Sequence, residues 1–88
     1  MDESADGIWF VYLLRCADGS LYTGITKDVS RRGKQHNAGT VSRYTRSRRP
    51  TSLVYQEAHA SQSSALKREA ALESMTRRDK LSLIHLAG

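Results

Sequence analysis

Apolar side chains fill the first clear segment of the chain without a break. In residues 8–14 both alternating sets of positions are apolar, one containing Val11 and the other Tyr12. A strand that is apolar on both faces belongs in the middle of a sheet. A second β-prone run, residues 21–25, contains Gly24, which is typical of a strand whose backbone is closely approached. Asp18-Gly19 lies between the runs and predicts a β-hairpin.

The length of the hairpin loop decides how the two tyrosines of this hairpin are oriented. If Asp18-Gly19 is a two-residue turn, Tyr12 and Tyr22 point to opposite faces of the sheet, because a shift of one residue reverses every side chain. A three-residue loop with a bulge at Gly19 instead pairs Tyr12 with Gly24 and brings both phenols to one face. The glycine would then leave a hollow beside Tyr12. The sequence leaves both registers open.

A helix is predicted after the hairpin. Asp28 is a suitable N-cap and Gly39 a suitable C-terminal stop, so the helix covers most of residues 28–39. Arg32 and His36, four residues apart, lie on one face of it. Gly33 in its interior costs about 1 kcal/mol relative to alanine. Residues 40–50 lack periodicity and are interpreted as a mobile loop or a short frayed helix.

The second half of the chain predicts one strand and two helices. Residues 53–57 form a short strand, and Ser61 begins a helix that runs to about residue 75. Thr76 caps a last helix in a variant of the capping box. The apolar side of the first of these helices is formed by Ala65, Leu66, Ala70, Leu72 and Met75. The last helix is anchored by Leu81, Leu83, Ile84 and Leu86.

The order β-β-α-β-α-α in 88 residues predicts a small α/β (α+β) fold. Its three-stranded sheet, mixed or antiparallel, has a central first strand with helices packed on it. Residues 1–7 are expected to be a disordered acidic N-terminus, and residues 8–88 a single domain.

Charge narrows the classes of partner. Fourteen Lys and Arg oppose nine acids, for a net charge of +5, which suits a polyanionic partner such as nucleic acid. A soluble basic domain without such a partner fits the charge equally well. Cys16 is the only cysteine, so an internal disulfide and a cysteine-rich zinc site are excluded. No apolar run approaches the roughly 20 residues of a membrane span. We therefore expect a cytoplasmic protein that binds no membrane.

Cations are concentrated in residues 27–50, where Asp28 is the one acid. Arginine forks fit phosphate oxygens, and an aromatic ring among them can stack on a base. A solvated basic face is the alternative. We predict nucleic-acid contacts from Lys27, Arg31, Lys34, Arg43, Tyr44, Arg46, Arg48 and Arg49.

Glu69 is the most informative acid. On a helix it shares a face with Ala65 and Leu72, so its carboxylate lies on or beside the buried stripe. A partly buried carboxylate needs a partner, which is either a metal ion or a nearby arginine.

Taken together, these positions form a specific pattern. Phe10-Val11-Tyr12 and Tyr22-Thr23-Gly24 are followed by Arg32, His36 and a later helical Glu69. This spacing strongly resembles the GIY-YIG nuclease family over residues 9 to about 84. The closest likeness is to its small stand-alone bacterial members and to the related catalytic subunit of structure-specific junction endonucleases.

The resemblance implies a fold like the one above and hydrolysis of DNA phosphodiesters, with branched or irregular DNA as substrate. It implies that Glu69 holds one divalent ion, Mg²⁺ or Mn²⁺, and that Arg32 clamps the scissile phosphate. Tyr12 would orient or deprotonate the attacking water, with Tyr22 beside it and His36 as a proton relay. A targeting protein partner is consistent with the small size of the domain.

Three positions depart from the pattern of the family. Ile25 replaces a lysine found in many members, Gly33 replaces an apolar residue, and Glu73 stands where the subgroup often has lysine. Gly33 and Glu73 motivate an alternative function, a non-catalytic nucleic-acid-binding module with a residual site.

Overall fold

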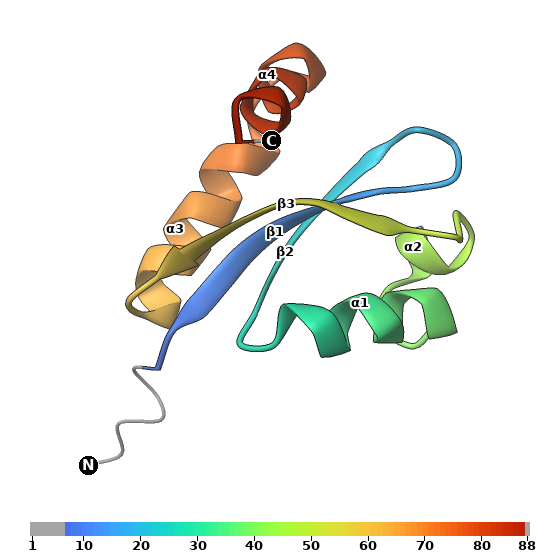
Figure 1. Cartoon of the computed structure of the whole chain (residues 1–88), viewed down its shortest axis with the longest axis horizontal. Helices are drawn as coiled ribbons and strands as arrows, with labels where there is room; N and C mark the ends of the chain where they lie inside the picture. Colours follow the sequence, from blue (N-terminus) through green and yellow to red (C-terminus); the bar gives the residue numbers. More distant parts are fainter. Residues whose placement is uncertain (1–6, 88) are drawn as a thin grey trace.

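The computed structural model describes residues 7–87, and the predicted disordered segment lies almost wholly outside the described residues. Its sheet has the order β2-β1-β3, and both strand pairs are antiparallel. Helices α1 and α2 lie on one side of the sheet, and α3 and α4 lie on the other (Figure 1). The elements are β1 (Trp9–Arg15), β2 (Leu21–Thr26), α1 (Val29–Ala38), α2 (Arg43–Arg46), β3 (Ser52–His59), α3 (Gln62–Glu73) and α4 (Arg77–Ala87).

The predicted architecture is confirmed, including the central first strand. One element is added. For residues 40–50 the sequence indicates a mobile loop or a short helix, and the structure has a helix there, the single-turn α2. Strand β3 is longer than predicted. It pairs with β1 along the whole of that strand, from Trp9 opposite His59 to Arg15 opposite Ser52. Backbone pairing, rather than the apolar content of β3, therefore sets its length.

The predicted helix caps are all present. The Asp28 carboxylate accepts a hydrogen bond from the Arg31 N–H at 3.0 Å, and Gly39 ends α1 with a φ of 80°. Ser61 caps α3, and the Thr76 hydroxyl accepts from the N–H of Asp79 at 3.1 Å. Local side-chain chemistry thus fixes where each of these helices begins.

The hairpin has the three-residue loop. Gly19 has a φ of 85°, and the N–H of Cys16 donates to the carbonyl of Ser20 at 2.9 Å across the loop. Tyr12 consequently pairs with Gly24. Tyr22 pairs with a residue two positions from Tyr12 on β1, so the two phenols share a face of the sheet.

The apolar core lies on the other face. Val11, Ala65 and Leu72 are fully buried there, at the contact of β1 with α3. Each such side chain stabilises the fold by about 1.5–3 kcal/mol on burial, somewhat less for alanine. The assignment of Leu66 and Leu86 to buried sides is wrong, since they are 47% and 83% exposed. Helix α3 meets the sheet along a stripe too narrow to cover Leu66, and α4 has no fully buried residue.

No helix in the described part of the chain is long and apolar enough to cross a membrane. The face of the sheet opposite the core carries Tyr12, and α1 and α2 cover it with polar side chains. Leu14 is buried on the Tyr12 face as well, so both faces of β1 carry buried apolar side chains.

We expect Gly24→Ala to destabilise the domain by about 1–3 kcal/mol, because the added methyl group would overlap the phenol of Tyr12. Urea denaturation measures the effect. Gly33→Ala is the matched control. Nothing lies within 4 Å of a methyl group there, so this change should stabilise α1 by up to about 1 kcal/mol. Equal stability of the Gly24→Ala protein and the wild type would contradict the close contact.

Candidate active site

A buried chain of hydrogen bonds crosses the polar face of the sheet. The phenol oxygen of Tyr12, on β1, lies 2.9 Å from Nε2 of His36, on α1. The other ring nitrogen, Nδ1, lies 2.8 Å from the hydroxyl of Thr45, on α2. Three elements that are separate in the sequence therefore meet at one imidazole ring.

Burial sets the protonation states of this pair. It is the main cause that raises the pKa of Tyr12 to about 12, with Tyr22 adding to it, while the charge of Arg32 acts in the opposite direction. Burial, together with the Arg32 guanidinium, lowers the pKa of His36 below its usual 6.5. Near pH 7 the phenol is protonated and the imidazole is neutral.

Aromatic contacts continue from His36 toward the surface. The ring of Tyr22 meets that of His36 edge to face, with centroids 5.1 Å apart, and stacks on Tyr44 at 6.0 Å. The guanidinium of Arg48 covers the Tyr44 ring, with Cζ 3.8 Å from the centroid. Tyr22 is half-buried, and its phenol is available beside Tyr12 on the same face.

Arg32 is half-buried on the same helix as His36. Its Nε donates to Oε1 of Gln35 at 3.2 Å, which fixes one edge of the guanidinium. Its charge affects the pKa values of both Tyr12 and His36, so the group lies close to both side chains. A half-buried guanidinium in this position is suited to binding a phosphate.

Glu69 is a half-buried carboxylate with no hydrogen bond or ion pair to the described residues, so the predicted alternative, a bridge to an arginine, is not found. Burial is the main cause that raises its pKa, and the charge of Glu73 adds to the effect. Its charge in turn raises the pKa of Tyr12, as the smallest of the effects that act on that phenol. Helix α3, which carries Glu69, packs on β1 and β2, and the part of Glu69 in the site stays a prediction.

A single divalent cation fits this donor set. Within residues 7–87 no three His, Cys, Asp or Glu side chains form a cluster, so a metal held by protein ligands alone is not built here. Mg²⁺ keeps several waters and commonly binds through one or two carboxylates together with substrate phosphates. The unpaired carboxylate of Glu69 is a ligand of this kind, and Glu69 is the residue that would hold the ion.

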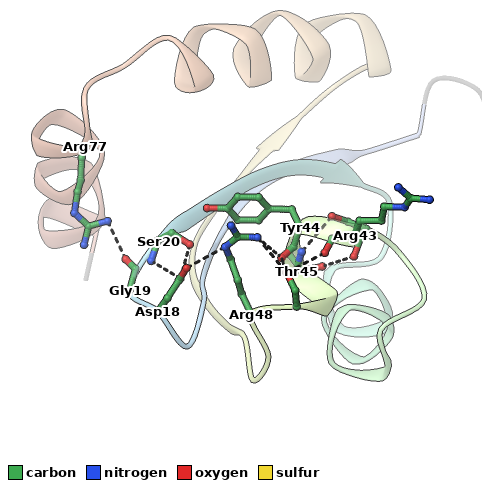
Figure 2. A network of polar contacts seen from close by, with 10 residues as sticks. Asp18, Gly19, Ser20, Arg43, Tyr44, Thr45, Arg48 and Arg77 are labelled. Atoms are coloured by element: carbon green, nitrogen blue, oxygen red, sulfur yellow. Dashed lines mark hydrogen bonds and ion pairs between the residues drawn. The ribbon is translucent and has the colours of Figure 1, made fainter.

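The predicted nucleic-acid contacts occupy two kinds of environment. Arg31, Lys34, Arg43 and Arg46 are exposed on α1 and α2. The Arg43 guanidinium extends away from the surrounding contacts (Figure 2). Lys27 places its ammonium 5.5 Å from the Trp9 ring.

Arg48 and Arg49 are engaged within the fold. Arg48 pairs with Asp18 at 3.0 Å and donates to the Tyr44 carbonyl at 3.0 Å (Figure 2). Arg49 donates to the carbonyl of Arg46 at 2.9 Å. Both side chains hold the α2 segment in place, and their contact with nucleic acid stays a prediction, as it does for Tyr44.

The hairpin loop joins this segment to the far side of the molecule. Asp18 contacts Arg48 next to α2, while the carbonyl of Gly19 accepts a hydrogen bond from Arg77 of α4 at 2.8 Å (Figure 2). The Ala17 N–H also donates to the Arg48 carbonyl at 2.8 Å. One short turn therefore fixes α2 and α4 relative to the sheet.

Two residues of the site were not predicted from the sequence, namely Thr45 and Gln35. Ser42 and Thr45 have the spacing of a helix N-cap, and the Thr45 N–H does donate to the Ser42 hydroxyl at 3.3 Å. That signal could have located α2. It does not reveal the contact of Thr45 with His36, which depends on how α1 and α2 pack together.

Comparisons with known proteins identify the family of this chain. The GIY-YIG catalytic domain family matches residues 8–82. A UPF0213 protein of Staphylococcus aureus strain Mu50 is 53% identical over 75 residues, which are 85% of this chain and 92% of that protein.

Two solved structures are also similar. The UPF0213 protein BH0048 from Bacillus halodurans has a TM-score of 0.60 and 43% identity, over 92% of this chain and 86% of that one. The protein EF2693 from E. faecalis has a TM-score of 0.60 and 38% identity, over 90% and 88%. On these matches, and with the two tyrosines on one face beside the arginine and histidine, the chain belongs to the GIY-YIG family of catalytic domains.

Proposed function

We propose that this protein is a divalent-metal-dependent endonuclease that hydrolyses phosphodiester bonds in DNA. Membership in the GIY-YIG family indicates a nuclease, and hence nucleic acid as the substrate. The observation that carries the proposal is the convergence on one face of a phenol, an imidazole and a half-buried arginine, with an unpaired carboxylate close enough to act on the phenol. These are the groups that general-base catalysis and phosphate binding require.

Arg32 is assigned to the scissile phosphate. Its guanidinium can bind two phosphate oxygens and stabilise the charge that grows on them in the transition state. The contact with Gln35 holds the group in one orientation before substrate binds, which reduces the ordering that binding requires.

Tyr12 is assigned to the attacking water. Its pKa of about 12 means that it cannot remove a proton from water at pH 7 as a free phenolate. It needs an acceptor for its own proton, and the neutral His36 at 2.9 Å is placed to be one. Tyr22, beside it on the same face, completes the wall of the site and can hydrogen-bond the water or the phosphate.

The metal ion, held by Glu69 together with phosphate oxygens, would neutralise charge on the phosphoryl group and on the leaving 3′-oxygen. Direct attack by water yields a 5′-phosphate and a 3′-hydroxyl.

The substrate class is proposed from the exposed cations. Arg31, Lys34, Arg43 and Arg46 present charge to a phosphate backbone, which binds with little dependence on base sequence. We therefore favour recognition of DNA shape, as at branched or irregular structures, with a targeting protein partner for further specificity.

A cleavage assay tests the proposal. The protein is incubated with end-labelled duplex, nicked, flap and junction DNA, and with RNA of matched sequence, in Mg²⁺, in Mn²⁺ or in a chelator. We expect metal-dependent cuts with 5′-phosphate ends, at a higher rate on branched than on plain duplex DNA. Cleavage that persists in the chelator would contradict the metal requirement. Binding without cleavage of any substrate would instead support the non-catalytic module.

A further inference from the structure

Thr45 is the most deeply buried polar residue that the proposed chemistry does not yet use. Its side chain is 0% exposed, as is that of His36, while Tyr12 is 2% exposed. The Thr45 hydroxyl lies on the far side of the imidazole from the phenol, so it cannot touch a substrate that approaches Tyr12. Any effect of Thr45 on the reaction must pass through His36.

The surroundings of the hydroxyl decide where its single proton goes. The Thr45 oxygen lies 3.4 Å from the carbonyl oxygen of Ser42, which can only accept a hydrogen bond. With the hydroxyl proton directed to that carbonyl, a lone pair of the oxygen faces Nδ1 of His36 at 2.8 Å. Nδ1 must then carry the proton of the neutral ring. Nε2, left without a proton, can only accept from the Tyr12 phenol.

We propose that Thr45 is a positioning residue that holds His36 in the tautomer with its proton on Nδ1, so that Nε2 is the acceptor for the proton of Tyr12. The tautomer follows from the contacts above. Its catalytic consequence rests on the proposed function.

The resulting proton transfer balances. As the water attacks phosphorus, its proton passes to the Tyr12 oxygen and the phenol proton passes to Nε2 of His36. The bond from phosphorus to the 3′-oxygen breaks, and the 3′-oxygen leaves with its electron pair and takes a proton from solvent. The other products of this step are a 5′-phosphate that carries the added hydroxyl, a neutral tyrosine and an imidazolium. The imidazolium keeps its Nδ1–H bond to Thr45 throughout, so that hydrogen bond can strengthen as positive charge develops on the ring.

The opposite arrangement gives a different site. If the Thr45 hydroxyl donated to Nδ1, the ring proton would lie on Nε2 and would point at the Tyr12 oxygen. His36 could not then accept a proton from the phenol. In one tautomer His36 can accept the proton of Tyr12, and in the other it can only donate to the Tyr12 oxygen. Thr45 controls which of the two tautomers is present.

Helix α2 is short, but the residues around it keep the hydroxyl in position. Ser42 caps the helix through the Thr45 N–H at 3.3 Å. Arg48, directly after the helix, pairs with Asp18 of the hairpin and donates to the Tyr44 carbonyl (Figure 2). These contacts, together with the stacking of Tyr44 on Tyr22, hold Thr45 against the imidazole.

Nitrogen NMR of the substrate-free protein tests the tautomer directly. Long-range ¹H–¹⁵N correlation spectra distinguish a protonated ring nitrogen from an unprotonated one, and the His36→Gln spectrum assigns the signals among the three histidines. In the wild type we expect a protonated Nδ1 and an unprotonated Nε2. Thr45→Val should shift His36 toward the Nε2–H form, and Thr45→Ser should restore the wild-type pattern.

Thr51→Val is the matched control. Thr51 is also a buried threonine, and its hydroxyl contacts Asn37 at 3.2 Å rather than His36. This variant should lose a comparable hydrogen bond and keep the tautomer of His36 unchanged.

Cleavage kinetics provide the second measurement. Thr45→Val should lower kcat by about 10–100-fold with little change in KM, and Thr45→Ser should recover most of the loss. A wild-type His36 with its proton on Nε2 would overturn the inference, even if Thr45→Val proved too unstable to study. An unchanged tautomer in folded Thr45→Val would do the same. If the protein cleaves nothing, the proposed function fails, while the NMR result still decides the tautomer.

Discussion

Replacing Glu69 with glutamine is expected to lower the rate of DNA cleavage by at least about 10³-fold without weakening the fold. The loss follows if the carboxylate holds the ion that stabilises the transition state, a contribution of several kcal/mol. The fold is spared because Glu69 forms no hydrogen bond or ion pair with the described residues. Initial cleavage rates at saturating Mg²⁺ measure the first effect, and thermal unfolding measures the second.

The sign of the stability change is itself informative. Burial raises the pKa of Glu69, so folding favours its protonated form, and the ionised form opposes folding above that pKa. Glu69→Gln removes the charge, and the variant should be as stable as the wild type or more so at pH 7. Glu73→Gln, one turn along α3, is the matched control and should keep most of the activity. Similar losses in the two variants would refute the special role of Glu69.

Replacing Tyr12 with phenylalanine should lower kcat by about 10²–10⁴-fold with little change in DNA affinity. The ring keeps its packing, and only the proton-transferring oxygen is lost. Stability should fall by about 1–3 kcal/mol, because Nε2 of His36 remains buried without a partner. Single-turnover cleavage and urea denaturation separate the two effects.

Tyr55→Phe is the comparison for this substitution. Tyr55 also donates to a partner, the carboxylate of Glu57, but from the opposite face of the sheet. This variant should be destabilised and yet cleave at nearly the wild-type rate. If both phenylalanine variants lost activity to the same extent, the effect of Tyr12→Phe would be one of folding rather than chemistry.

Much of the fold was accessible from local patterns in the sequence. The continuous apolar run predicted the central strand, and capping residues such as Asp28 and Thr76 predicted the starts of α1 and α4. Register arithmetic reduced the hairpin to two alternatives, and the positive φ of Gly19 selects the one that aligns the phenols. These features depend on residues close together in the sequence or on the alternation of side chains along a strand. Both can be read from the sequence alone.

The sequence named most residues of the candidate site, but it did not reveal the contacts between them. Tyr12, Tyr22, Arg32 and His36 were named from their spacing and the family resemblance, and the structure brings them together. The contact of Thr45 with His36 joins residues on α1 and α2. The solvent exposure of Leu66 depends on how α3 packs against the sheet. Such packing of one element against another leaves little trace in a single sequence.

The hairpin turn has a practical consequence for anyone who labels this protein. Exposed turn tips are the usual places to insert a tag or to open a chain for circular permutation. Here the turn supplies Asp18 to Arg48 on one side of the sheet and the carbonyl of Gly19 to Arg77 on the other. An insertion there would disconnect α2 from α4 while leaving every residue of the candidate site in the sequence. Reporter groups are better placed on the exposed outer surface of α3.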